Sequence, residues 1–231
     1  MISTISDWAK YLGACAHAAT PLPSPSGFSD EFGHRRAVDL PFLHWMRRDT
    51  RSDASALSSL TSSQAPDVAL WASLVLGAGI PEHTLDFHRA SALRSSFDQG
   101  SLFPQRDRTG PIALEVWTEV ELSSLHAIAW MADRDSGLRS LVRATARWLV
   151  ENLQPDNATN HPWAIHIFIA LGMGESDSGA IPYAETLLHN CQVSQGHPDA
   201  FSSLILRDAA DALERSSVAT WILDESDETA V

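Results

Sequence analysis

The chain has 231 residues, of which 44% are hydrophobic and eight are tryptophan, so it has the composition and the length to bury a core of its own and is not a disordered protein. Its formal net charge of −13 repels phosphate backbones, and we therefore expect no nucleic-acid partner. No apolar run approaches the roughly 20 residues that cross a bilayer, and no secretion-signal pattern begins the sequence, so we expect no membrane contact and a cytoplasmic protein.

Prolines and glycines divide the chain into helical segments. Proline suits the first turn of a helix, and Pro66, Pro111 and Pro162 each precede a run with apolar residues at helical spacing. In chain order the predicted helices span about 3–19, 53–63, 66–77, 82–96, 113–132, 136–153, 162–172, 181–192 and 198–214. No segment shows the sustained alternation of a strand and no linker divides the chain. The sequence therefore predicts a single all-α domain.

Three segments are expected to differ from regular helix. Residues 20–51 are richer in proline and aromatic residues, which predicts a partly helical, packed segment. The connection 97–110 is long and polar, as functional loops often are. Residues 216–231 are acidic, and we expect them to form a mobile tail.

The predicted helix 113–132 is apolar on nearly all sides, which is typical of a buried helix. At about 100° per residue, Glu115, Glu119 and His126 nevertheless fall on one narrow stripe. Such groups need partners or a solvated cavity, so one hypothesis makes them acid–base catalysts. The alternative is structural. The helix dipole favours acids in the first turns of a helix, and either glutamate could form an ion pair with Arg143 or Arg147 of the next helix.

The segment 154–163 contains the densest polar cluster of the sequence. Its candidate residues are Asp156, Asn157, Asn160, His161 and Trp163. Asp156 and His161 are candidate catalytic groups, and the two asparagines and the indole suit recognition of a hydroxylated ligand by hydrogen bonds and stacking. The alternative interpretation is that these are ordinary turn and N-cap residues.

Two pairs of similar segments indicate an internal repeat. Residues 152–154 and 190–192 both end a predicted helix in Asn-x-Gln, 38 residues apart, and residues 161–164 and 197–200 both begin one with His-Pro-x-Ala, 36 residues apart. Tandem units of this length predict stacked antiparallel helical hairpins. Because the chain returns after each hairpin, we expect His161 and His197 at the same end of the bundle, with His197 a further candidate substrate-binding residue.

The hairpin period, together with Gln154-Pro155-Asp156 and Trp163, resembles the α/α-toroid proteins, the broad group of terpenoid cyclases and six-hairpin glycosidases and lyases. The resemblance covers about residues 66–214. It implies a buried inner ring of helices with an active site in the loops that enter it. The Asp-rich motifs DxDD and DDxxD of terpenoid cyclases are absent, and the chain is too short for six full hairpins. The expected architecture is therefore a partial α/α toroid or arc.

Other patterns support no metal or cofactor. HExxH, CxxC, GxSxG, P-loop and Rossmann glycine motifs are all absent from the sequence. A lone histidine, His166, lies in an apolar helix and is predicted to be a satisfied core residue rather than a ligand. Arg106, in a charged triplet of the long connection, is either a clamp for an anionic substrate or part of a solvated charge run.

Two hypotheses of function remain open from the sequence. The first is an enzyme that acts on a small or carbohydrate-like substrate by acid–base hydrolysis or elimination. The second is a non-catalytic helical-hairpin module that binds a protein partner. An enzyme requires its polar groups to converge, whereas a module requires an exposed apolar face.

Overall fold

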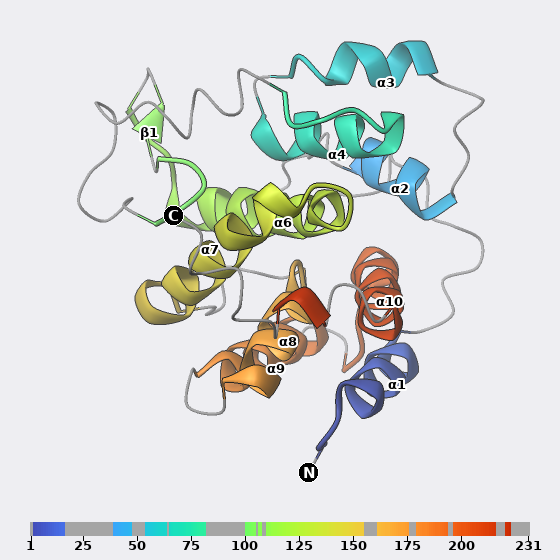
Figure 1. Cartoon of the computed structure of the whole chain (residues 1–231), viewed down its shortest axis with the longest axis vertical. Coiled ribbons are helices and arrows are strands. Elements are labelled where there is room, and N and C mark those ends of the chain that lie inside the picture. Colours follow the sequence, from blue (N-terminus) through green and yellow to red (C-terminus); the bar gives the residue numbers. More distant parts are fainter. Residues whose placement is uncertain are drawn as a thin grey trace.

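The computed structural model describes residues 2–16, 39–47, 54–63, 65–81, 100–104, 106–107, 110–154, 161–175, 179–193, 196–215 and 220–222. Within these residues the fold is all-α, as predicted (Figure 1). The helices are α1 (Ile5–Cys15), α2 (Asp39–Arg47), α3 (Ala54–Leu60), α4 (Pro66–Leu76), α6 (Leu114–Ala132), α7 (Arg139–Asn152), α8 (Ile165–Gly174), α9 (Ala180–Val193) and α10 (Ala200–Glu214), with a 3-10 turn (Ser136–Leu138) before α7. Two short strands, β1 (Arg106–Asp107) and β2 (Gly110–Pro111), form an antiparallel pair. None of the described helices is long and apolar enough to cross a membrane.

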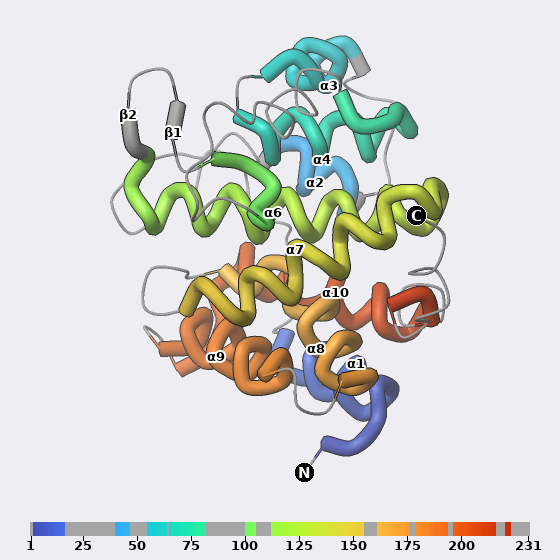
Figure 2. The backbone as a smooth tube through the Cα atoms, turned by 60° about the vertical axis from the view of Figure 1, so that its left-hand side comes forward, coloured from blue at the N-terminus to red at the C-terminus, as the bar shows by residue number. Residues whose placement is uncertain are grey.

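Helix α6 lies in the middle of the molecule, with the other helices on either side (Figures 1 and 2). Helix α4 packs on α6, and α2 and α3 pack in turn on α4. On the other side α8 packs on α9, and the N-terminal helix α1 lies along α10, from near the opposite end of the sequence. The first and last of the described helices therefore pack against each other in this half of the structure.

Burial of α6 confirms the prediction from its apolar composition. Every side chain from Glu121 to Ala132 is buried, including four polar or charged ones. A buried polar group is costly unless it has a partner, so the partners of this helix identify the polar interior of the protein.

Local signals set the ends of two helices, and those of α4 were predicted. Helix α4 has Pro66 in its first turn and ends at Gly77, whose φ of 67° is left-handed and whose N–H is bonded to the last turn. Helix α10 begins after Asp199, whose carboxylate accepts a hydrogen bond from the N–H of Ser202 at 2.6 Å.

The two loops that open with His-Pro lie next to each other. His161 Nε2 is 4.0 Å from Asp199 Oδ2, two residues beyond His197. The arrangement of the hairpins as a toroid or an arc stays a prediction. The predicted helix 82–96 lies outside the described residues.

The segment 220–222 corrects the prediction of a mobile tail from residue 216 onward. Trp221 and Ile222 are buried, and Trp221 Nε1 donates to Asp133 Oδ1 at 3.1 Å. Arg143 Nη1 donates to the carbonyl oxygen of Trp221 at 2.9 Å. An indole and a buried arginine therefore fix this segment against α6 and α7, although acidic residues follow it in the sequence. The acidic residues 223–231 lie outside the described part.

Candidate functional site

A carboxylate–histidine pair joins α6 to the segment that precedes α8. Glu119 Oε1 lies 2.9 Å from His161 Nδ1 and accepts a second hydrogen bond from Trp163 Nε1 at 2.7 Å. An ionised carboxylate only accepts hydrogen bonds, so His161 Nδ1 carries a proton when Glu119 is ionised. We call these two residues the Glu119–His161 pair.

His161 lies between two acidic side chains at the edge of the core. Its side chain is 15% exposed, and its Nε2 faces Asp199 Oδ2 at 4.0 Å. The Asp199 side chain is 47% exposed, while the Glu119 side chain is 12% exposed. The edge of Phe201 supports the imidazole, with ring centroids 5.2 Å apart. A nearly buried carboxylate thus orients the ring on one side, and a more exposed carboxylate lies near Nε2 on the other.

The backbone next to this pair is strained. Ala164 has a φ of 57°, in the left-handed region that costs a non-glycine residue about 1–2 kcal/mol. Its N–H donates to His126 Nδ1 at 3.2 Å. The preceding residue, Trp163, donates its indole N–H to Glu119. Strain of this kind persists where the surrounding contacts fix the conformation, and it is concentrated at functional sites.

His126 does not share a cavity with Glu119, which corrects the expectation of one solvated stripe. The imidazole is fully buried, and Nδ1 accepts from the Ala164 N–H. Nε2 therefore carries the proton and donates to Asp208 Oδ2 at 3.0 Å. Both ring nitrogens are engaged with the protein, so His126 positions the chain and has no free nitrogen for a substrate.

Asp208, on α10, is the centre of a second polar cluster that the sequence did not single out. Its Oδ2 accepts from His126 and from Trp130 Nε1 at 2.7 Å, and its Oδ1 accepts from Trp45 Nε1 at 3.0 Å. The available signal was an acid at an apolar position of the helix, four residues after Leu204 and four before Ala212.

His166 is buried, as predicted, but it is not satisfied. Neither ring nitrogen has a hydrogen-bond partner, and the ring centroid lies 4.4 Å from that of His126. Burial lowers the pKa of His166 well below its usual value of 6.5, and the neighbouring His126 lowers it further. A neutral imidazole is the form that this environment favours.

The remaining predicted residues have separate positions. Trp163 is fully buried, so its indole is not available to stack on a ligand, and its role is to hold Glu119. Glu115 is half-buried in the first turn of α6. His197 is exposed, with its Nδ1 3.0 Å from the carbonyl oxygen of Pro198. The side chain of Arg106 lies outside the described part, as do Asp156, Asn157 and Asn160 entirely.

Two arginines of α7 form hydrogen bonds outside α6. Arg147 Nε donates to Glu175 Oε1 at 3.1 Å, and Arg143 bonds the backbone of Trp221. The Oε1 atom of Glu119 accepts hydrogen bonds from His161 and Trp163, and the structural alternative for Glu119, an ion pair with α7, stays a prediction. Among the described residues no group of three or more His, Cys, Asp or Glu side chains is arranged to hold a metal ion.

Comparisons of the chain with protein-family models, with curated proteins and with solved structures found no match. The toroid resemblance therefore stays a prediction, and we infer function from the geometry of the site alone.

Proposed function

We propose that the protein is an enzyme that acts on a small molecule by general acid–base catalysis, in a hydrolysis or an elimination. The observation that carries the proposal is the contact of 2.9 Å between Glu119 Oε1 and His161 Nδ1, in a partly exposed imidazole whose Nε2 lies 4.0 Å from Asp199 Oδ2. Histidine is the side chain that most often transfers protons near neutral pH.

Each residue of the site has a separate role in the proposed chemistry. His161 Nε2 takes a proton from an attacking water or from a carbon next to the leaving group, and returns it to the leaving group as the bond breaks. Glu119 stabilises the imidazolium that forms and keeps the ring oriented, since its carboxylate is held by the Trp163 indole on the other side. Asp199 adds a second negative charge near Nε2.

The polar residues 156, 157 and 160 come just before His161 in the sequence, and in the proposal they bind the polar groups of the substrate. The burial of Trp163 removes the stacking platform that argued for a sugar. The substrate class is therefore a small polar molecule with hydrogen-bonding groups, and a carbohydrate-like compound is one member of that class.

The second hypothesis, a module for a protein partner, has less support. The most exposed large apolar side chains of the described residues belong to four helices: Tyr11, Leu76, Leu114, Val116 and Val193. Single exposed apolar residues are normal on a protein surface, whereas a docking face requires a contiguous patch.

A comparison of variants on a panel of small substrates tests the proposal. The panel contains nitrophenyl esters, nitrophenyl glycosides and hydroxy acids. Hydrolysis is measured as release of nitrophenol, and elimination is measured as formation of a conjugated double bond. We expect turnover of one class, a loss of about a hundredfold or more in His161→Gln, and a smaller loss in Glu119→Gln. His189→Gln is the matched control, because His189 is exposed on α9 and lies outside the pair.

Turnover that survives in His161→Gln, or a panel on which no His161-dependent turnover is found, would overturn the proposal. The unfolding midpoint of each variant is measured in parallel. A large loss of stability in Glu119→Gln combined with unchanged turnover would identify the pair as a structural contact only.

A further inference from the structure

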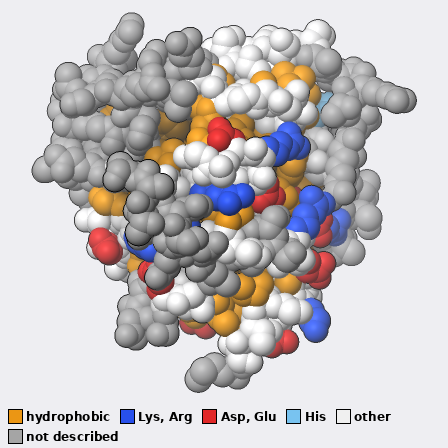
Figure 3. Space-filling model, viewed as in Figure 1, with side chains coloured by type: hydrophobic (Ala, Val, Ile, Leu, Met, Phe, Trp, Pro, Cys, Tyr) orange, Lys and Arg blue, Asp and Glu red, His pale blue; other side chains and the backbone are white. Residues whose placement is uncertain are grey.

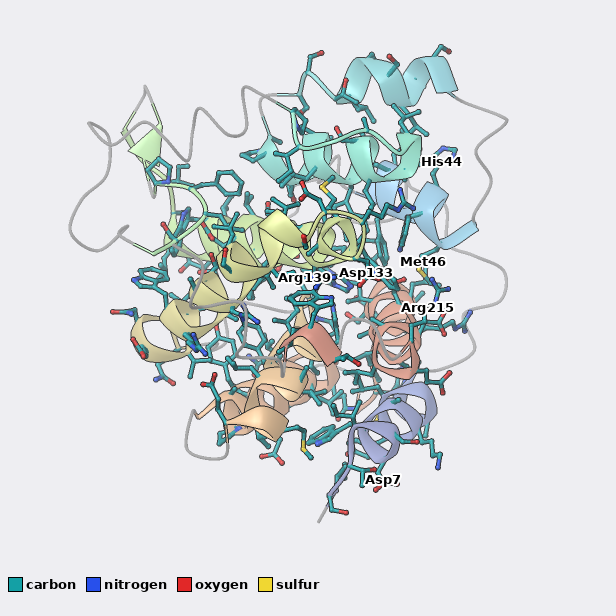
Figure 4. All side chains as sticks on the ribbon, viewed as in Figure 1. Asp7, His44, Met46, Asp133, Arg139 and Arg215 are labelled. Atoms are coloured by element: carbon teal, nitrogen blue, oxygen red, sulfur yellow. The ribbon has the colours of Figure 1, made fainter. Side chains whose placement is uncertain are left out.

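A cleft lies between α2, α4, α6 and α10. It encloses about 300 Å³ and shares no lining residue with the Glu119–His161 pair. Figure 4 labels three of its lining residues, His44, Met46 and Arg215, near the junction of α2 with α10. Small-molecule sites have volumes from roughly 300 Å³ upward, so this cleft suits a compact ligand.

The walls of the cleft are two indole rings that the protein holds in place. Trp45 and Trp130 have ring centroids 5.2 Å apart, and both indole N–H groups donate to Asp208. Because one carboxylate fixes both rings, the aromatic surface is present before any ligand binds. Leu74 and Met46 add further apolar surface to the same lining. Preformed apolar walls of this kind suit a flat ring or a branched hydrocarbon group.

The rim of the cleft carries two arginines, Arg134 and Arg215, and both are exposed. Neither guanidinium has a carboxylate partner among the described residues, although the protein has a net charge of −13. The guanidinium of Arg215 lies 5.2 Å above the ring of Trp130, so one wall and one positive charge adjoin each other. Figure 3 shows basic side chains on this face of the molecule, over the junction of α6 and α10.

The acidic residues of the cleft are already engaged. Asp208 accepts three N–H donors, from Trp45, Trp130 and His126, and its side chain is only 7% exposed. Asp211, the other acid in the lining, has an interaction of its own. The charges left for a ligand are therefore the two guanidinium groups, which bind carboxylates through paired N–H donors.

We propose that this cleft binds a small aryl carboxylate, with the ring against the apolar lining of Trp45, Met46 and Leu74 and the carboxylate on Arg134 and Arg215. This inference is independent of the proposed catalytic role, since no residue of the Glu119–His161 pair takes part. An aryl carboxylate matches both halves of the site, whereas an uncharged or cationic analogue matches only the apolar half.

Titration with phenylacetate, followed by nuclear magnetic resonance of isotopically labelled tryptophan indoles, tests the inference. Two indole N–H resonances, those lost in Trp45→Phe and in Trp130→Phe, are expected to shift as phenylacetate is added. Phenylacetamide keeps the ring and lacks the charge, so we expect it to bind about tenfold more weakly or worse. Phenethylamine should bind more weakly still.

The double substitution Arg134→Gln with Arg215→Gln should reduce the affinity for phenylacetate to that for phenylacetamide. Arg207→Gln is the matched control, because Arg207 also lies on α10 but does not line the cleft. Both arginines are exposed, so we expect the variants to fold as the parent does.

Three results of these titrations would each overturn the inference, and a fourth concerns the double variant. They are no shift of the two indole resonances with phenylacetate, equal affinity for phenylacetate and phenylacetamide, and equal loss of affinity in Arg207→Gln and in the double variant. A retained preference for phenylacetate in the double variant would likewise remove the arginines from the site.

Discussion

Replacing His166 by leucine should make the protein more stable, and the gain should grow as the pH falls. The imidazole is fully buried beside His126, and neither of its nitrogens has a hydrogen-bond partner. An unpaired buried polar group costs about 1–3 kcal/mol, whereas a hydrophobic exchange of similar volume costs less than about 1.5 kcal/mol. We therefore expect His166→Leu to raise the free energy of unfolding by about 1 kcal/mol near pH 7.5.

The pH dependence follows from the lowered pKa of His166. In the unfolded chain this side chain binds a proton below its ordinary pKa of 6.5, while in the folded protein it stays neutral to a much lower pH. The unfolded state therefore binds more protons below pH 6.5, and the parent loses stability through this residue as the pH falls, by at most about 1.4 kcal/mol for each pH unit. The parent is therefore less stable near pH 5 than near pH 7.5, and the leucine variant does not suffer this loss.

Urea unfolding followed by tryptophan fluorescence, near pH 7.5 and near pH 5, measures both effects. His189→Leu is the control, because His189 is exposed, and its effect should stay within about 0.5 kcal/mol at either pH. A His166→Leu variant that is less stable than the parent, with the same dependence on pH, would show that the imidazole has a stabilising partner and would refute this reasoning.

Two further predictions concern buried contacts elsewhere in the fold. Glu121 is fully buried, and its carboxylate accepts hydrogen bonds from the backbone N–H groups of Leu102 and Phe103 at 3.0 and 2.6 Å. Glu121→Ala should therefore lower the free energy of unfolding by about 3 kcal/mol. A change below about 0.5 kcal/mol in urea unfolding would contradict this role. A Cβ atom on Gly172 would lie 2.8 Å from the backbone nitrogen of Ile181, so Gly172→Ala should cost about 1–3 kcal/mol in thermal unfolding, and an unchanged midpoint would mean that α8 and α9 separate at little cost.

Local signals made the helices predictable. The prediction for 66–77 agrees closely with α4, because Pro66 begins the helix and Gly77 ends it through interactions within a few residues. The prediction for 113–132 agrees equally well with α6, since a helix that is apolar on nearly all sides is typically buried, whichever elements cover it. The docking of Trp221 was missed, because its partners Asp133 and Arg143 lie far away in the sequence.

The candidate site was predictable only in part. Glu119 and His161 were both singled out, each from its own segment, and the structure brings them together at 2.9 Å. His126 was grouped with Glu119 on the basis of helical spacing, but its ring nitrogens bond Ala164 and Asp208 instead. Shared helical phase indicates a common face of one helix, and it does not indicate which other elements cover that face.

The sequence by itself determined the helical class, the central burial of α6 and the charge that argues against nucleic acid, because periodicity, helix-end residues and net charge are local or additive properties. Only the tertiary structure decided which polar groups meet. Asp208 gains two indoles and an imidazole from distant helices, and His166 receives no partner at all. The physical reason is that the free energy of a buried polar group depends on the groups packed around it, and these come from parts of the chain that no local pattern connects.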